Sequence, residues 1–129
     1  MRIRFIAAVA FALLLSLAVP AAPPEKGAML SHDVFFTLKD KSEAARSRLV
    51  AACEKYLKGH PGEVFFAAGT LAGDLAREVN DRDFDVALHI VFRTRADHDR
   101  YQSHGRHKKF VEENQAAWAR VRVFDSYVK

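Results

Sequence analysis

Three histidines lie close together in the second half of the chain, at His98, His104 and His107. Imidazole nitrogens bind transition metals, and the i, i+3 spacing of His104 and His107 would put both rings on one face of a helix. Gly105 interrupts that helical phase, however, and neither a cysteine pair nor a His-Glu-x-x-His sequence accompanies the histidines. We therefore predict no metal site and no cofactor.

Other motifs with well-defined chemistry are missing from the sequence. There is no glycine-rich phosphate loop and no nucleophile elbow, and scattered serine, histidine and aspartate residues do not by themselves predict a catalytic triad. His32 falls on the apolar face of a predicted strand, where it is either a core histidine bonded to backbone or a group directed into a pocket. A structural role stays equally open for His104 and His107 at a helix junction and for Tyr101 in packing.

The N-terminus has the pattern of a secretory signal peptide. Arg2 and Arg4 precede an apolar run over residues 6–19, and the small residues of Val19-Pro20-Ala21 fit a cleavage site. We expect cleavage after Ala21, with cleavage after Ala22 as the alternative, and hence a periplasmic or secreted protein without stable membrane insertion. An uncleaved anchor is disfavoured because the run is shorter than the roughly 20 residues that a spanning helix needs.

The composition indicates a folded chain with one domain. Half of the 129 residues are apolar and 28% are charged, as in ordered globular proteins. Loss of the two arginines within residues 1–21 leaves 18 basic and 16 acidic residues, a net charge of +2 with neutral histidines, so no nucleic-acid partner is expected. Cys53 is the single cysteine and forms no disulfide within the chain; its helical spacing from Leu49 and Leu57 predicts a buried side chain.

The hydrophobic periodicity predicts an α+β domain over residues 29–129, after a flexible lead-in at residues 22–28. Asp40 with Glu43, and Thr94 with Asp97, have the spacing of helix caps. In chain order we expect a strand at 30–38, a helix to about residue 58, strands at 64–68 and 84–92, a helical region at 96–118 broken at Gly105, and a strand at 121–128. This β-α-β-β-α-β order is typical of the ferredoxin-like fold, a four-stranded antiparallel sheet with both helices on one face.

The second face of the predicted sheet has no cover. Phe35 is expected to point to that face, and neighbouring strands also place apolar residues there. A large exposed apolar patch usually marks an interface. A homodimer in which two such sheets pack together is the simplest way to bury it.

Four segments of the domain carry a resemblance to a known family. They are Leu30–Leu38 (LSHDVFFTL), Phe84–Phe92 (FDVALHIVF), Tyr101–His107 (YQSHGRH) and Val123–Tyr127 (VFDSY). Together they resemble the stress-responsive A/B barrel family, and the resemblance covers residues 29–129. It implies a dimeric α/β barrel, whereas it says less about function: one plant branch cyclises polyketides by an aldol-type condensation, and a related barrel group contains monooxygenases.

The resemblance implies a catalytic set of His32, Tyr101 and His107, which match a histidine on the first strand and two positions of the branch's Tyr-x-x-His-x-x-His stretch. His107 would be the base that acts on a carbon next to a carbonyl, Tyr101 would donate to the oxygen that gains charge, and His32 would add a second polar group. His104 and Phe36 are the predicted ligand contacts. Gly105 replaces the family's usual proline after the middle histidine and loosens the turn that aims His107.

Two functions remain open. The first is an exported homodimer that binds a small apolar or aromatic ligand in a pocket between helices and sheet. The alternative is an acid–base enzyme for a carbonyl compound, polyketide-cyclase-like or monooxygenase-like, that uses His32, Tyr101 and His107. Turnover with the pH dependence of a histidine would distinguish the enzyme from the binding protein.

Overall fold

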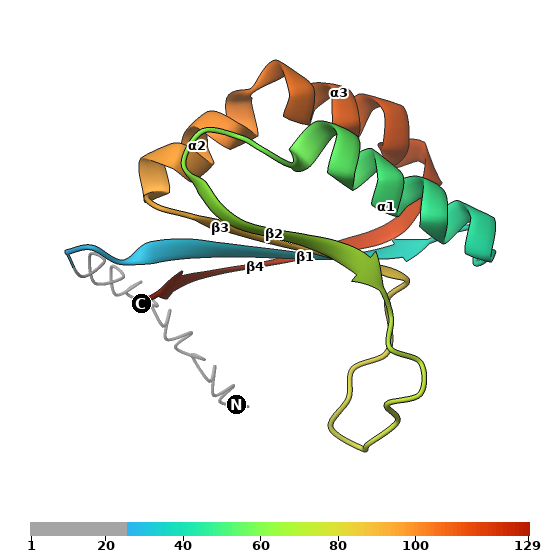
Figure 1. The fold of residues 1–129 in the computed structure, drawn as a ribbon. Coiled ribbons are helices and arrows are strands. Elements are labelled where there is room, and N and C mark those ends of the chain that lie inside the picture. Colours follow the sequence, from blue (N-terminus) through green and yellow to red (C-terminus); the bar gives the residue numbers. More distant parts are fainter. Residues whose placement is uncertain (1–25) are drawn as a thin grey trace, which may run out of the picture.

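The computed structural model describes residues 26–129 (Figure 1). The predicted signal peptide and most of the predicted lead-in lie outside these residues. Within them, no helix has both the length and the apolar character needed to cross a membrane. The elements in chain order are β1 (Met29–Leu38), α1 (Glu43–Leu57), β2 (Glu63–Thr70), β3 (Val86–Phe92), α2 (Arg95–Ser103), α3 (Gly105–Asn114), the short 3₁₀ helix η1 (Gln115–Ala117) and β4 (Trp118–Val128).

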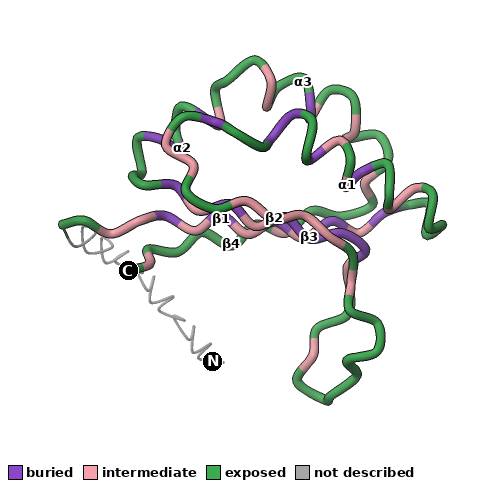
Figure 2. The backbone as a smooth tube through the Cα atoms, viewed as in Figure 1, coloured by how far each residue is buried: buried purple, intermediate pink, exposed green. Residues whose placement is uncertain are grey.

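The four strands form one antiparallel sheet in the order β2-β3-β1-β4. The helices of the described chain lie over one face of this sheet and leave the other face open (Figure 1). Buried residues gather where helices and sheet meet, whereas the loop between β2 and β3 is mostly exposed (Figure 2). This is the ferredoxin-like arrangement predicted from the order of the elements.

Strand β1 lies between β3 and β4 and divides the two faces residue by residue. Its buried residues Leu30, His32, Val34, Phe36 and Leu38 face the helices, while the residues between them are half-buried on the open face. The alternation predicted for residues 30–38 is therefore confirmed. The layer beneath the helices is a single hydrophobic core.

Helix α1 contributes Cys53 to this core. The side chain is fully buried, as its helical spacing predicts, and burial raises the pKa of the thiol to about 12. The first turn is capped by Ser42, whose Oγ accepts a hydrogen bond from the Ala45 N–H at 3.2 Å. Asp40 was the expected cap, but it lies two residues before Ser42 and accepts from the Ser42 N–H at 2.9 Å.

The second helical region is divided as predicted, although its end differs. Thr94 caps α2 by accepting from the Asp97 N–H at 3.1 Å, and the helix stops where His104 adopts an extended backbone with ψ 143°. Helix α3 starts at Gly105 and ends at Asn114. Trp118, expected at the helix end, instead begins β4, because its backbone pairs with Leu38 of β1.

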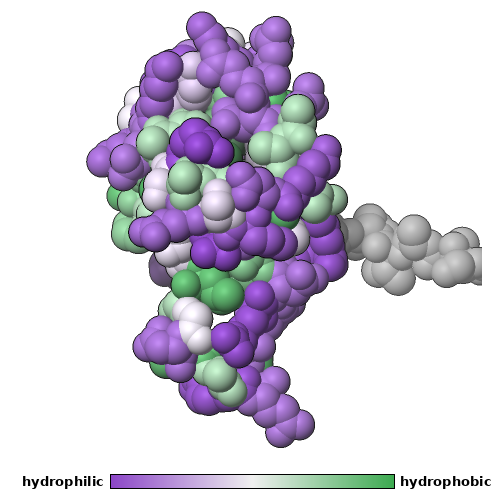
Figure 3. All heavy atoms as spheres, turned by 90° about the vertical axis from the view of Figure 1, so that its right-hand side faces the viewer, coloured by the Kyte–Doolittle hydropathy of each residue, from purple (hydrophilic) through white to green (hydrophobic). Residues whose placement is uncertain are grey.

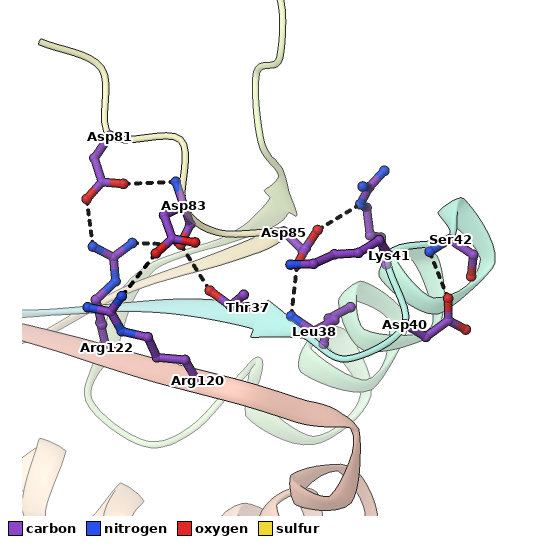
Figure 4. A network of polar contacts seen from close by, with 11 residues as sticks. Thr37, Leu38, Asp40, Lys41, Ser42, Asp81, Asp83, Asp85, Arg120 and Arg122 are labelled. Carbon is purple, nitrogen blue, oxygen red and sulfur yellow. Dashed lines mark hydrogen bonds and ion pairs between the residues drawn. The ribbon is translucent and has the colours of Figure 1, made fainter. Parts of the chain in front are cut away.

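Strand β3 begins at Val86 rather than at the predicted residue 84, and the residue just before it, Asp85, is buried. The Asp85 carboxylate is buried and accepts hydrogen bonds from the Leu38 N–H at 2.8 Å, Lys41 Nζ at 2.8 Å and Arg46 Nε at 3.2 Å (Figure 4). Burial by itself would raise the pKa of Asp85, but these donors outweigh it and lower the pKa. The carboxylate thus ties the start of β3 to the end of β1 and to α1.

The loop over residues 71–85 projects on the open side of the sheet (Figure 1). Its base is held to β4 by ion pairs between Arg122 and Asp81 at 2.7 Å and between Arg120 and Asp83 at 3.0 Å (Figure 4). Arg122 and Thr37 also donate to the Asp83 carbonyl. These contacts fix the loop beside the open face.

We expect Asp85→Asn to lower the free energy of unfolding by about 2 kcal/mol at neutral pH, since a buried charge-assisted acceptor is lost. The pKa of Asp85 is lowered from 3.8, so its stabilisation is present above pH 3.8 and fades as the pH falls through the pKa of the folded state. Urea unfolding at neutral and acidic pH measures both effects. Asp83→Asn, at an exposed carboxylate, is the control and should cost less than about 1 kcal/mol; equal losses would contradict the role of Asp85.

Candidate functional site

A pocket of about 200 Å³ lies between the sheet and the helices, and most of its lining is apolar. The predicted residues His32, Phe36, Tyr101 and His107 all belong to the lining. They come from β1, from α2 and from α3, so the fold brings together positions that are up to 75 residues apart. His104 is the one predicted site residue that does not line this pocket.

His32 is buried at the sheet and held by a carboxylate. Its Nδ1 lies 2.6 Å from Oδ1 of Asp125, the residue opposite it on β4. A carboxylate oxygen can only accept, so in the neutral ring Nδ1 carries the proton and Nε2 is left as an acceptor. Asp125 thereby sets both the tautomer and the orientation of His32.

Tyr101 is the most crowded side chain of the site. The residue is 2% exposed, and its ring contacts His107 at 4.7 Å, His60 at 5.0 Å and His32 at 5.8 Å between centroids. Burial strongly raises the pKa of its hydroxyl, which makes no hydrogen bond with another residue in the described part of the chain. The hydroxyl therefore stays protonated and is a donor without a partner.

His107 projects from α3 against the Tyr101 ring. Burial, reinforced by the nearby imidazoles of His32 and His60, lowers the pKa of His107 to about 4. An unperturbed histidine titrates near 6.5, so burial keeps this ring neutral over the physiological range. The neutral ring is the form that can accept a proton, but its lowered pKa makes it a weaker base than an exposed imidazole.

His104 fixes the junction between α2 and α3. Its backbone is extended, and its Nδ1 accepts a hydrogen bond from the Arg106 N–H at 3.1 Å, which caps α3. The exposed His104 ring contacts His60, whose Nε2 in turn lies 2.9 Å from the Tyr56 carbonyl. The junction set by His104, and not a proline, is what aims the first turn of α3 and with it His107.

Two residues of the site were not assigned a role from the sequence. Asp125 belongs to a segment that carried the family resemblance, but nothing in linear spacing says which β4 residue faces His32. Trp118 is the second; it packs on Phe36 at 5.1 Å and also lines the pocket. Its buried indole N–H has no hydrogen-bond partner among residues 26–129, so it is a second free donor.

The site thus combines apolar walls with a few polar groups. Tyr101 and Trp118 supply donors, and His32 and His107 supply imidazole nitrogens. Such a set can bind a small neutral molecule with one or two acceptor oxygens. The proton donors and acceptors also have the chemical types needed for general acid–base catalysis.

Several solved structures are similar to this one. No curated protein matches the chain. A dimeric ferredoxin-like protein from Thermobifida fusca is similar in structure, with a TM-score of 0.67 and 19% identity over 80% of this chain and 93% of its own. A Dabb family protein from Mesorhizobium loti has a TM-score of 0.66 and 22% identity over 79% and 98% of the two chains.

Hydroxynitrile lyase from Passiflora edulis is similar as well, with a TM-score of 0.64 and 24% identity over 83% of this chain and 96% of its own. At these identities the likeness concerns the fold. The model of the stress responsive A/B barrel domain, Dabb, matches residues 30–128. Because this match covers well over half of the chain, the chain belongs to the stress-responsive A/B barrel domain family.

Proposed function

We propose that this protein is an exported homodimer whose pocket binds a small, neutral apolar or aromatic compound that carries a carbonyl group. The observation that carries the proposal is the apolar pocket into which Tyr101, Trp118 and two imidazoles are built. The Tyr101 hydroxyl and the Trp118 indole N–H have no acceptor among the described residues, and a carbonyl oxygen of the ligand would supply one. The aromatic part of the ligand would contact the apolar walls.

The volume of the pocket limits the size of the ligand. An apolar cavity of about 150 Å³ is large enough for benzene. The present pocket of about 200 Å³ therefore suits one aromatic ring with a small substituent. Its buried donors would cost free energy if left unpaired, which favours a ligand with an acceptor over a pure hydrocarbon.

Binding is measurable through Trp118, the only tryptophan of the chain and part of the pocket lining. We expect acetophenone to change its fluorescence in a saturable way and ethylbenzene, which lacks the oxygen, to bind more weakly. Tyr101→Phe should weaken acetophenone binding about three- to tenfold, the value of one hydrogen bond, and leave ethylbenzene nearly unchanged.

Tyr127→Phe is the matched control, because Tyr127 lies on β4 outside this pocket. The control should bind both compounds as the unmodified protein does. Equal acetophenone affinities of the two variants would contradict the assignment of Tyr101, and no saturable binding of either compound would contradict the pocket as a ligand site.

The homodimer is proposed from the open face of the sheet. Phe65 and Phe124 are each 53% exposed there, and Phe35 packs edge-to-face on Phe124 at 5.7 Å and on Phe84 at 4.9 Å. In Figure 3 apolar surface gathers between the main body and the projecting loop, whereas the upper layer is largely hydrophilic. The similar protein from Thermobifida fusca is described as dimeric. A second sheet is the cover that fits such a face.

Phe124→Glu should convert the dimer to a monomer, because it would bury a charge between the two sheets without a partner. Light scattering after gel filtration measures the mass, which should fall by half. Arg48→Glu, on the exposed side of α1, is the control and should stay dimeric. A monomeric unmodified protein, or a folded Phe124→Glu variant that remains dimeric, would overturn this arrangement.

Export is inferred from the N-terminal sequence alone. The charged start, the apolar run and the small residues that end at Ala21 have the order of a cleavable signal. The protein would then work in the periplasm or outside the cell, where its ligand must be found. Mass spectrometry of the intact protein, accurate to one residue, tells whether residues 1–21 have been removed.

Acid–base catalysis on a carbonyl compound is the second candidate, and one specific contact favours it. The His107 ring lies against Tyr101 at 4.7 Å, so a neutral base and a proton donor are adjacent in the pocket. His107 could remove a proton from the carbon next to the carbonyl while Tyr101 donates to the oxygen that becomes an enolate. The similarity to a hydroxynitrile lyase supports this fold as a scaffold for an enzyme.

Exchange of the methyl hydrogens of acetophenone for deuterium, followed by NMR, tests this chemistry. His107→Asn should lower the enzyme-dependent exchange rate by about a hundredfold or more. The pKa of His107 is lowered to about 4, so the rate should not change between pH 6 and 8 and should fall as the pH drops through about 4. No exchange above that of buffer, or an unaffected His107→Asn variant, would leave ligand binding as the function.

A further inference from the structure

Three side chains that bind metals in many proteins converge from three elements beside the ligand pocket. His32 lies on β1, Asp125 lies opposite it on β4, and His98 reaches the same place from α2. One ligand atom of each residue lies within 4.8 Å of the other two, and the two rings are 4.8 Å apart between centroids. Tetrahedral ligands bound at about 2.0–2.2 Å stand about 3.4 Å apart, so shifts of about an ångström would complete the site.

His98 provides the second, independent observation. The residue is 8% exposed, yet its Nδ1 is buried and has no hydrogen-bond partner among the described residues. The nearest carboxylate, of Asp99, lies 3.6 Å from Nδ1, beyond hydrogen-bond distance. A buried polar atom without a partner calls for an explanation, and a bound ion is one of the recognised ones.

The other ring nitrogen of His98 already has a hydrogen-bond partner. Its Nε2 lies 3.1 Å from the side-chain amide nitrogen of Gln102. If Nδ1 binds a metal, Nε2 carries the proton, and a half-turn of the Gln102 amide would present its oxygen as the acceptor. A metal-bound histidine generally has such a partner on its second nitrogen, so Gln102 fits that role.

An ion can reach the site from solvent. A surface pocket of about 290 Å³ has both His98 and Asp125 in its lining. Arg95 also lines it, but the Arg95 guanidinium lies 3.0 Å from Asp99 and its charge is paired there. Two imidazoles and one carboxylate contribute a single negative charge, which suits a divalent cation.

We infer that His32, His98 and Asp125 form a site for one divalent transition-metal ion of the zinc class. Two histidines and one carboxylate are a known zinc ligand set that leaves a fourth position for water or a ligand. Mixed nitrogen and oxygen donors disfavour calcium and magnesium, which prefer oxygen alone. The exposed side of Asp125 would place the open position toward the surface pocket.

The metal site and the ligand pocket share one residue but otherwise depend on different side chains. Tyr101, Trp118 and His107 carry the proposed ligand binding and proton transfer and are not metal ligands here. His32 is shared, since it also lines the ligand pocket. An ion would replace the proton between His32 and Asp125 and would thereby form part of one wall of that pocket.

Calorimetric titration of the purified protein with zinc chloride tests the inference, after treatment with chelator and without a histidine tag. We expect one ion per chain and a visible absorption band of four-coordinate cobalt when cobalt(II) is added instead. His98→Leu, which keeps the apolar packing, should weaken zinc binding by about tenfold or more. Asp125→Asn should weaken it as well, and thermal unfolding in the absence of metal checks that both variants fold.

The chain offers a matched control in its second histidine–aspartate pair. His89 and Asp33 also lie 2.6 Å apart, but they lie on the open face of the sheet. Within residues 26–129, no third potential metal ligand joins them. His89→Leu should bind zinc as the unmodified protein does. The inference is overturned if no ion binds at one per chain, or if His98→Leu and His89→Leu bind zinc equally well. Acetophenone binding to the chelator-treated protein reports separately on the ligand pocket.

Discussion

The register of β1 between β3 and β4 is the constraint on which the site depends. Side chains alternate across an antiparallel sheet, so a shift by one residue would exchange the buried and open faces. The observed register sets Asp125 opposite His32 and, on the other side of the sheet, His89 opposite Asp33. A buried imidazole needs a hydrogen-bond partner, and here the neighbouring strand supplies it without any loop.

The two histidine–aspartate pairs show how surroundings change the effect of one interaction. Both have a nitrogen–oxygen distance of 2.6 Å, but the His32 side chain is 5% exposed and that of His89 is 41% exposed. In the single chain water competes with the His89 pair, so its contribution to the stability of one chain is small. The His32 pair lies at the edge of the core, where the carboxylate fixes which nitrogen faces the pocket.

Much of the fold and part of the site could be predicted from the sequence, for definite reasons. Alternation on β1 and helical spacing around Cys53 report local burial, and the order of elements then limits the topology. The family resemblance pointed to His32, Tyr101 and His107, which do share a pocket. The resemblance could not show that His104, three residues before His107, lies outside the pocket. Its exposed ring caps α3 at the break between α2 and α3, and this break is a feature of the folded chain.

Contacts between residues far apart in the chain could not be predicted from the sequence. Asp85 places a charged side chain within a largely apolar segment, and only its donors, which come from β1, α1 and Lys41, explain why this carboxylate can be buried. Trp118 follows a helical pattern but joins the sheet through backbone pairing with Leu38. The approach of His98 to His32 likewise depends on how α2 packs on the sheet, which no spacing within α2 reveals.

Close packing of imidazole rings around Tyr101 determines the protonation of this part of the interior. Four imidazoles contact the Tyr101 ring at centroid distances of 4.7–6.2 Å, those of His32, His60, His98 and His107. Burial lowers the pKa of the last three of these rings, and neighbouring imidazoles reinforce the effect. Protonating one ring makes protonation of the next more costly, so His60, His98 and His107 stay neutral near pH 7. Without a bound metal ion, this part of the pocket is polar but not ionic, which favours a neutral carbonyl compound over an anion that would need a fixed positive charge.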